Sequence, residues 1–244
     1  EMLDEVVVTG YGGKQLRTKV TNSISKVSEE SLKVGVFSNP AQALSGAVSG
    51  LKVTQSSGNP GSTPTIVLRG GTEWDGSGSP LVMVDGQLRD GLNDINPEDI
   101  ESMSVLSGPA AAALYGSNAA SGVILITTKK GKEGKARIII SNNSTFSNPF
   151  IMPEFQNSYI NRAGSFASWG DKASSLFGTY EPKDFFNTGT NIQNNVSLSV
   201  GNEKNQTYLS VGTTNATGII QNSKYDRYNF TFRNTTKFLK DKMT

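Results

Sequence analysis

The chain has 244 residues with 23 basic and 21 acidic side chains, a formal charge of +2 that argues against a nucleic-acid-binding protein, which usually carries a basic footprint. It contains no cysteine and no histidine, which excludes disulfides, thiolate metal sites, cysteine nucleophiles and Ser-His-Asp triads. Since no acid/base pair stands in a supporting context either, we expect no enzyme, no cofactor and no metal site.

Hydropathy gives no sign of a membrane-spanning helix, because no apolar run approaches the required length of about 20 residues. Spanning β-strands give a much weaker signal, so a β-barrel membrane protein stays possible. The chain starts at Glu1 with no charged-then-apolar segment after it, and we expect this end to be processed or trimmed.

Residues 1–134 predict a mixed domain of short strands and helices. A strict strand–helix–strand rhythm is missing, which favours an α+β arrangement. Serine before two glutamates indicates a helix start at Ser28, and asparagine before proline indicates helix starts at Asn39 and Asn96. The second of these helices is expected to run to Gly50, and a further helix to span Ala110–Tyr115. Short apolar runs predict strands, in chain order, at Glu5–Thr9, Ile24–Val27, Leu51–Thr54, Thr65–Arg69, Leu81–Asp85, Met103–Leu106 and Gly122–Thr128.

Residues 135–244 have a different pattern, in which apolar and polar side chains alternate with a period of two. Between Arg227 and Lys237, three aromatic residues share one face and polar residues share the other. Gln193–Gly201 alternates in the same way, and two less regular strands are predicted at Ala136–Phe146 and Gln206–Ala216. Each strand has about 10 residues, the length of a tilted membrane-spanning strand.

The connections between these strands alternate in length. Gly201–Asn205 is a tight polar turn, Thr217–Lys224 is longer, and Asn148–Thr190 is a loop of about 40 residues. Short turns on one rim and long loops on the other are typical of outer-membrane barrels. About four strands cannot close a barrel, so the sheet is either the start of a larger barrel or a water-soluble sheet, and we favour the first.

An ordered set of motifs carries a family resemblance. The stretches LDEVVVTGYG, PAQALSGAVSGLKVTQSSGNPG, IVLRG, PLVMVDG and INPEDIESMSVLSGPAAAALYGSNAASGVILITTKKGK follow one another between residues 3 and 132. Together they resemble the plug domain of SusC-type TonB-dependent outer-membrane transporters. NNVSLSVGNEKNQTYLSVG and YDRYNFTFR resemble the first barrel strands of that family. The chain departs from the family at Ser107, where a charged residue is common, and at Asn118, where arginine is common.

The resemblance implies a fold: an α+β plug domain followed by antiparallel strands of a transmembrane β-barrel, which has about 22 strands in full. The implied division is a TonB-box segment and flexible link at 1–13, a plug domain at 14–134, and barrel strands at 135–244 with an extracellular loop at 148–190.

The resemblance also implies a function, namely TonB-dependent active import of a large nutrient across the outer membrane of a Gram-negative bacterium. The implied partners are TonB, a SusD-like surface lipoprotein, an oligosaccharide or peptide substrate, outer-membrane lipid, and a dimer of transporter–lipoprotein pairs. The alternative from another class is a non-transporting surface β-protein, such as an adhesin or a glycan-binding module. The discriminating feature is whether the N-terminal domain is enclosed by the later strands.

The first site that the resemblance implies is a TonB-binding segment near the N-terminus. It is extended and β-branched, and the glycines after it would let it detach and add to a partner's sheet edge. The alternative interpretation is that this segment forms the first strand of the plug. The residues of this segment are Asp4, Glu5, Val6, Val7, Val8 and Thr9.

Two further sets of residues are expected in the plug. Trp74 and Asp75 lie in a Gly/Ser-rich loop, where they could stack on a sugar and hydrogen-bond to its hydroxyls. The alternative is a flexible loop whose tryptophan packs on the plug itself. Arg69, Asp85 and Arg89 are expected to pair with the barrel wall, and otherwise they are ordinary solvated loop charges.

Overall fold

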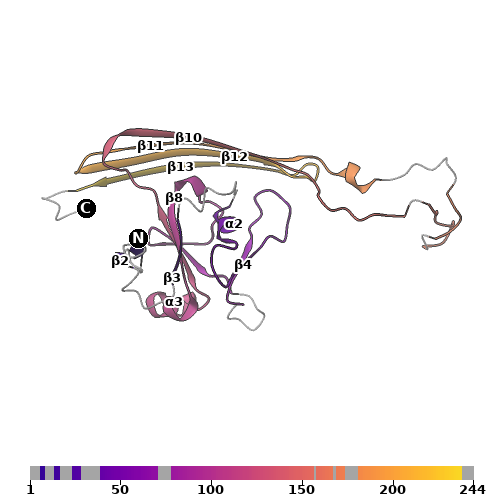
Figure 1. The fold of residues 1–244 in the computed structure, drawn as a ribbon, viewed down its shortest axis with the longest axis horizontal. Helices are drawn as coiled ribbons and strands as arrows, with labels where there is room; N and C mark the ends of the chain where they lie inside the picture. The colour runs from indigo at the N-terminus through magenta and orange to yellow at the C-terminus, as the bar shows by residue number, and fades with distance from the viewer. Residues whose placement is uncertain are drawn as a thin grey trace.

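The computed structural model describes residues 6–8, 14–16, 24–28, 39–70, 78–156, 158–166, 169–173 and 181–237. Figure 1 shows a small mixed domain that lies against one face of a long four-stranded sheet, and an extension that leaves one end of this sheet. Among the described residues, no helix has the length and apolar character needed to cross a membrane. The small domain denotes residues 24–133, and the long sheet denotes the strands between residues 134 and 236.

The small domain is built on a five-stranded sheet with the order β3-β8-β9-β6-β7, in which only β6 and β9 run parallel. Two separate two-stranded sheets pair β4 with β5 and β1 with β2. The strands are β1 Val6–Val8, β2 Lys14–Leu16, β3 Ile24–Ser28, β4 Leu51–Thr54, β5 Thr65–Leu68, β6 Leu81–Val84, β7 Gln87–Arg89, β8 Ile100–Leu106 and β9 Val123–Thr128. The helices are α2 Pro40–Leu44 and α3 Gly108–Tyr115, with 3-10 turns η2 Pro97–Asp99, η3 Ser117–Ala119 and, in the extension, η4 Pro182–Phe185.

Both faces of the central strand β9 are buried, as its unbroken apolar run predicts. Ile124 and Ile126 point to one side, where α2 and the β4–β5 hairpin cover the sheet through Leu44 and Leu68. Val123 and Leu125 point to the other side and pack with the alanines of α3 and η3. The side chains of these alanines are short enough for the helix to lie close to the sheet, which places the core of the small domain on both sides of β8 and β9.

The helix predicted from Asn39 is shorter than expected. Asn39 caps it, since its side-chain oxygen accepts the N–H of Ala41 at 2.9 Å, but α2 ends at Leu44 rather than Gly50. The backbone of Ser45 is extended, with a ψ of 121°, and Gly46 after it has a φ of 76°. The chain therefore leaves the helix here, and Ala47 lies in solvent instead of the core.

Other predicted elements of the small domain need smaller corrections. The helix predicted at Ala110–Tyr115 begins two residues earlier, at Gly108, because Pro109 suits the first turn of a helix. The edge strand β7 was not predicted, since Gln87–Arg89 has no apolar alternation and is exposed throughout. Ser28 ends β3, and the helix predicted after it lies outside the described residues.

The long sheet consists of β10 Gly134–Ser147, β11 Gly189–Gly201, β12 Asn205–Thr217 and β13 Lys224–Thr236, in consecutive antiparallel order. The predicted alternation is confirmed: Tyr228, Phe230 and Phe232 are 73%, 71% and 63% exposed on the outer face. The intervening residues of β13 face the small domain and are more buried than their neighbours. The four predicted strands are therefore correct. Each begins one to four residues earlier than predicted, and their C-terminal ends agree within one residue.

The outer face of the long sheet is an apolar band. The register aligns Ile140, Val196, Val211 and Phe230 across all four strands, and Ile138, Leu198, Leu209 and Phe232 in the row beside it. Most of these side chains are exposed although large and apolar. An apolar outer face over a polar inner face is the signature of a membrane-spanning β-sheet.

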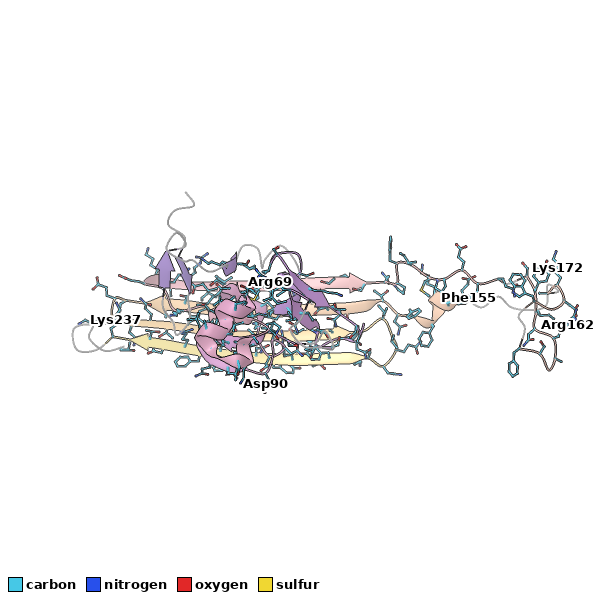
Figure 2. The ribbon with its side chains drawn as sticks, turned by 90° about the horizontal axis from the view of Figure 1, so that it is seen from below. Arg69, Asp90, Phe155, Arg162, Lys172 and Lys237 are labelled. Atoms are coloured by element: carbon cyan, nitrogen blue, oxygen red, sulfur yellow. The ribbon has the colours of Figure 1, made fainter. Side chains whose placement is uncertain are left out.

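The two rims of the long sheet differ, as the loop lengths predict. The β11–β12 turn closes one rim within a few residues, with Asn202 donating its N–H to the Asn205 carbonyl at 2.7 Å. The opposite rim carries the connection at 218–223 and the extension at 148–188. In Figure 2, Phe155, Arg162 and Lys172 lie along this extension beyond the sheet, whereas Arg69 and Asp90 lie over the sheet with the small domain.

Candidate functional site: the contact between the small domain and the long sheet

A seven-residue stretch, residues 93–99, carries most of the polar contacts between the two layers, and we call it the anchoring segment. It ends in the η2 turn, which Asn96 caps by accepting the N–H of Glu98 at 3.2 Å. Pro97 at the first position of the turn fixes its backbone. The turn thus presents the side chains of Asn96, Glu98 and Asp99 to the polar face of the long sheet.

The first two strands of the long sheet bind the anchoring segment through amide side chains. Asn96 Nδ2 donates to Asn195 Oδ1 on β11 at 3.0 Å, and Asn143 Nδ2 on β10 donates to Glu98 Oε1 at 3.4 Å. Gly212 makes room for this contact, because a Cβ at that position would lie 2.6 Å from Asn96 Nδ2.

Asp99 joins the anchoring segment to the other two strands. This residue is only 3% exposed, and both of its carboxylate oxygens accept hydrogen bonds from the long sheet. Tyr208 Oη on β12 donates to Oδ1 at 2.9 Å, and Thr231 Oγ1 on β13 donates to Oδ2 at 2.8 Å. A buried carboxylate is costly unless it is hydrogen-bonded, so these two hydroxyls are what allow Asp99 to sit between the layers.

Backbone carbonyls of the anchoring segment complete the contact with β13. Arg227 Nη1 donates to the Asn93 carbonyl at 2.5 Å, and Asn229 Nδ2 donates to the Asp94 carbonyl at 2.9 Å. The anchoring segment therefore makes side-chain hydrogen bonds with all four strands of the long sheet.

A second contact lies towards the short-turn rim. Asp85, in the turn after β6, accepts from Arg233 Nη1 of β13 at 2.8 Å, and the same nitrogen donates to Thr128 Oγ1 at 2.6 Å. Asp85 has a φ of 49° and also accepts the N–H of Thr128 at 3.1 Å, which fixes its carboxylate. The two charged side chains are 28% and 26% exposed, so solvent partly screens this ion pair.

Of the three charges expected to meet the barrel wall, the structure brings Asp85 to the long sheet. Arg69 follows β5 with a φ of 54° and donates its backbone N–H to the Gly50 carbonyl at 2.7 Å. Arg89 is exposed at the end of β7. The described residues include no ion pair or hydrogen bond from Arg69 or Arg89 to the long sheet, and the roles assigned to all three stay predictions.

The other predicted site residues are only partly described. Trp74 and Asp75 lie outside the described residues, as do Asp4, Glu5 and Thr9. Val6–Val8 form β1, whose one partner among the described strands is β2, in a register that sets Val7 opposite Gln15. Three residue pairs thus hold this hairpin together, and the main sheet of the small domain does not include it.

The sequence does not predict the anchoring segment as a site, because its Asn-Pro-Glu-Asp motif indicates only a helix start. A signal was nevertheless present in the strands. Asn195, Asn229 and Thr231 all occupy the predicted polar faces, where a lumen-facing side chain needs a partner. Within the described part of the chain, no group of three or more carboxylates could hold a metal ion.

Comparison with known proteins agrees with this geometry. The family model of the TonB-dependent Receptor Plug Domain matches residues 17–123. The chain is 35% identical over 99% of its length to the TonB-dependent receptor SusC of Bacteroides thetaiotaomicron, and 37% identical over 93% of its length to the TonB-dependent receptor P39 of Formosa agariphila. It spans 25% and 23% of these two relatives.

A solved structure shows the same arrangement of the two layers. The RagAB peptide importer in its open-open state superposes with a TM-score of 0.75 at 25% identity, over 96% of this chain and 30% of that one. The small domain therefore corresponds to the plug and the long sheet to the first strands of the barrel, with the polar face towards the lumen. The chain belongs to the SusC-type TonB-dependent receptors of the Gram-negative outer membrane, as their plug domain followed by the start of their β-barrel.

Proposed function

We propose that the whole protein imports a large nutrient across the outer membrane, with the plug as the gate of the barrel lumen. The observation that carries this proposal is the position of the plug, which hydrogen-bonds to all four described strands on their polar face. A plug in this position blocks the lumen beside these strands, so import requires that it rearrange. Energy for that step would come through TonB.

The N-terminal hairpin is a suitable binding segment for TonB. An isolated two-stranded hairpin is marginal in water, and β1–β2 has only three residue pairs. Val6–Val8 can therefore leave β2 and add to the edge of a partner sheet through backbone hydrogen bonds. We propose Asp4–Thr9 as the TonB-binding segment and the residues up to 13 as its flexible link.

On the outer side of the membrane, we propose a SusD-like surface lipoprotein as the partner that captures substrate, with pairs of transporter and lipoprotein forming dimers. The substrate is an oligosaccharide or a peptide, and Trp74 and Asp75 are proposed to contact it. The peptide alternative is supported by the similarity to RagAB, which is a peptide importer.

We favour import over a non-transporting adhesin or glycan-binding module, because the N-terminal domain does not stand beside an independent sandwich. It lies against one face of the long sheet (Figure 1). This face is polar, and the other face is an apolar band. The relatives reported above are receptors and importers rather than enzymes.

The experiment uses the full-length protein with the substitution Val7→Pro. Proline removes the N–H that strand addition needs, so we expect energised uptake to be lost while substrate binding by purified protein stays within twofold of the unsubstituted value. Val7→Ile is the matched control, since isoleucine keeps both the N–H and the β-branched side chain, and it should transport normally. Normal uptake by the proline variant would refute the TonB-box assignment.

A further inference from the structure

A cavity of about 360 Å³ lies between the plug and the barrel wall near the short-turn rim. The wall lines it with side chains of β10, β11 and β12, and the plug lines it with β8 and the connection at 129–133 that leads into the wall. The place of the cavity follows from the register, because β10 begins at Gly134, opposite Gly201 at the short turn. We call this cavity the linker pocket.

The linker pocket gathers positive charge. Five basic side chains line it against two carboxylates, those of Glu101 and Glu133, which leaves an excess of three positive charges. The basic side chains are Lys129, Lys130, Lys132, Lys135 and Arg137. Among the described residues, the side chains of the last four have no ion pair and no hydrogen bond, and neither carboxylate has one. Because like charges in one cavity repel each other, the pocket favours a bound anion.

The strand register places Arg137 on the lumen face of the wall. It lies opposite Ser199, which in turn lies opposite Tyr208. Tyr208 is buried and donates its hydroxyl to the plug, so this row of side chains faces the plug rather than lipid. The apolar band covers the other face of the same strands. A cleft of one sign of charge beside a low-dielectric wall focuses the electric field, which raises the local concentration of counter-ions.

The backbone of the connection at 129–133 is held against the wall. Lys132 donates its N–H to Ser199 Oγ on β11 at 3.0 Å. Gly131 lies so close to β12 that a Cβ at this position would be 2.4 Å from the backbone nitrogen of Thr207. The backbone that carries three of the lysines is therefore fixed beside the cavity, and a preformed site loses less entropy when a ligand binds.

The chemistry of the lining fits a phosphate group. Lysine binds phosphate as a point charge, and arginine binds it through two parallel hydrogen bonds. The hydroxyl of Ser199 accepts from the backbone of Lys132 and keeps its own hydrogen to donate. A doubly charged phosphate group offsets most of the excess charge, which a neutral ligand leaves uncompensated. The volume lies within the range of ~300–1,000 Å³ that is usual for small-molecule pockets.

We propose that the linker pocket binds a phosphate group, which belongs either to a soluble phosphate ester or to an anionic lipid headgroup. Short turns of outer-membrane barrels lie on the periplasmic side, so the ligand reaches the pocket from the periplasm or from the inner leaflet. The connection at 129–133 belongs to the plug and Arg137 to the wall, so a phosphate group held by both fastens the plug in the barrel. This role goes beyond the proposed import function and does not depend on it.

The test uses full-length protein purified in phosphate-free detergent solution, with glycerol phosphate as the probe, glycerol as its neutral counterpart and calorimetric titration as the measurement. We expect saturable binding of glycerol phosphate and none of glycerol. Lys130→Gln combined with Arg137→Gln should weaken the binding by about tenfold or more, because it removes one cation from each layer. The matched control is Arg162→Gln combined with Lys172→Gln, which removes the same two kinds of charge from the extension beyond the sheet (Figure 2) and should leave binding unaltered.

Repeating the titration in lipid nanodiscs identifies the source of the phosphate group. Weaker binding of glycerol phosphate in nanodiscs that contain phosphatidylglycerol than in nanodiscs of phosphatidylcholine alone would assign the linker pocket to a lipid headgroup. Equal binding in both would assign it to a soluble ester.

Three results would overturn the linker pocket as a phosphate site: no saturable binding of glycerol phosphate in detergent, equal binding of glycerol, or equal affinities of the two double variants. None of these measurements requires TonB or transport. A failure of the import proposal would therefore leave the result for the linker pocket unchanged.

Discussion

Asp99 shows how one residue can hold two domains together. Its carboxylate accepts one hydrogen bond from a hydroxyl of β12 and another from a hydroxyl of β13. Because Asp99 is only 3% exposed, water cannot replace either donor. A lone charge at such a position would oppose the assembly of plug and barrel. The stabilisation therefore resides in the trio of Asp99, Tyr208 and Thr231, rather than in any one of them.

The substitution Tyr208→Phe tests this trio. Removing the hydroxyl leaves Asp99 Oδ1 buried without its donor, so we expect the free energy of unfolding of the plug to fall by about 1–3 kcal/mol. The measurement is denaturant unfolding of the full-length protein in detergent, followed by protease digestion of the released plug.

Tyr228→Phe is the matched control for this prediction. Tyr228 lies on the outer face of β13 and is 73% exposed, so loss of its hydroxyl should leave the stability of the plug unchanged. Equal effects of the two substitutions would contradict the role of the trio, because only Tyr208 reaches Asp99.

The strands illustrate what can be predicted at the scale of elements. A period of two predicted β11 and β13 with the correct faces, because each strand divides a lipid-facing side from a lumen-facing side. The pattern of β10 is less regular, since Ile138, Ile139 and Ile140 are consecutive and Ile139 faces the lumen row of Ser197. In the plug, α2 ends early because Ser45 has an extended backbone and Gly46 a positive φ, and residue type alone does not fix these angles.

The contact between plug and barrel could not be predicted from sequence to the same degree. Asn96 and Asn195 are separated by almost a hundred residues, and only the fold places them 3.0 Å apart. The sequence predicted polar lumen faces and plug charges as classes, and it named Asp85. It did not predict the anchoring segment. Part of this contact is made by backbone carbonyls, which every residue has, so the amino-acid type does not reveal them.

The outer face of the long sheet leads to a prediction about membrane insertion. Phe230 lies in the row shared with Ile140, Val196 and Val211, near the middle of its strand. Phe230→Arg would place a charge against lipid, and we expect it to destabilise the inserted barrel by about 2–4 kcal/mol. The measurement is the urea midpoint of full-length protein refolded into vesicles.

Phe230→Leu is the control for that substitution, because it shortens the side chain and keeps it apolar. Its midpoint should lie close to that of the unsubstituted protein. An unchanged midpoint for the arginine variant would mean that this face of β13 is not in contact with lipid.

At the scale of the whole molecule, the plug is joined to the wall by contacts that differ in burial. The anchoring segment holds a buried carboxylate and meets four strands, whereas Asp85 and Arg233 form a partly solvated pair. The N-terminal hairpin stands apart from both, with three residue pairs of its own. A force applied at the hairpin thus acts along the chain first on the N-terminal part of the plug, and on the anchoring segment, which lies later in the chain, only after it.

If import requires the anchoring segment to move relative to the wall, a covalent link there must stop it. Asn96→Cys combined with Gly212→Cys provides this link, because Asn96 Cγ lies 3.5 Å from the position of a Cβ at residue 212, within reach of a disulfide. We expect the oxidised double variant to bind substrate but to lose energised uptake, and a reducing agent to restore uptake. Each single variant should transport under both conditions, which controls for the lost Asn96–Asn195 hydrogen bond. Full uptake by the oxidised form would show that the path opens while residues 93–99 stay fixed to the wall, and the moving part of the plug would then lie on the N-terminal side of this segment.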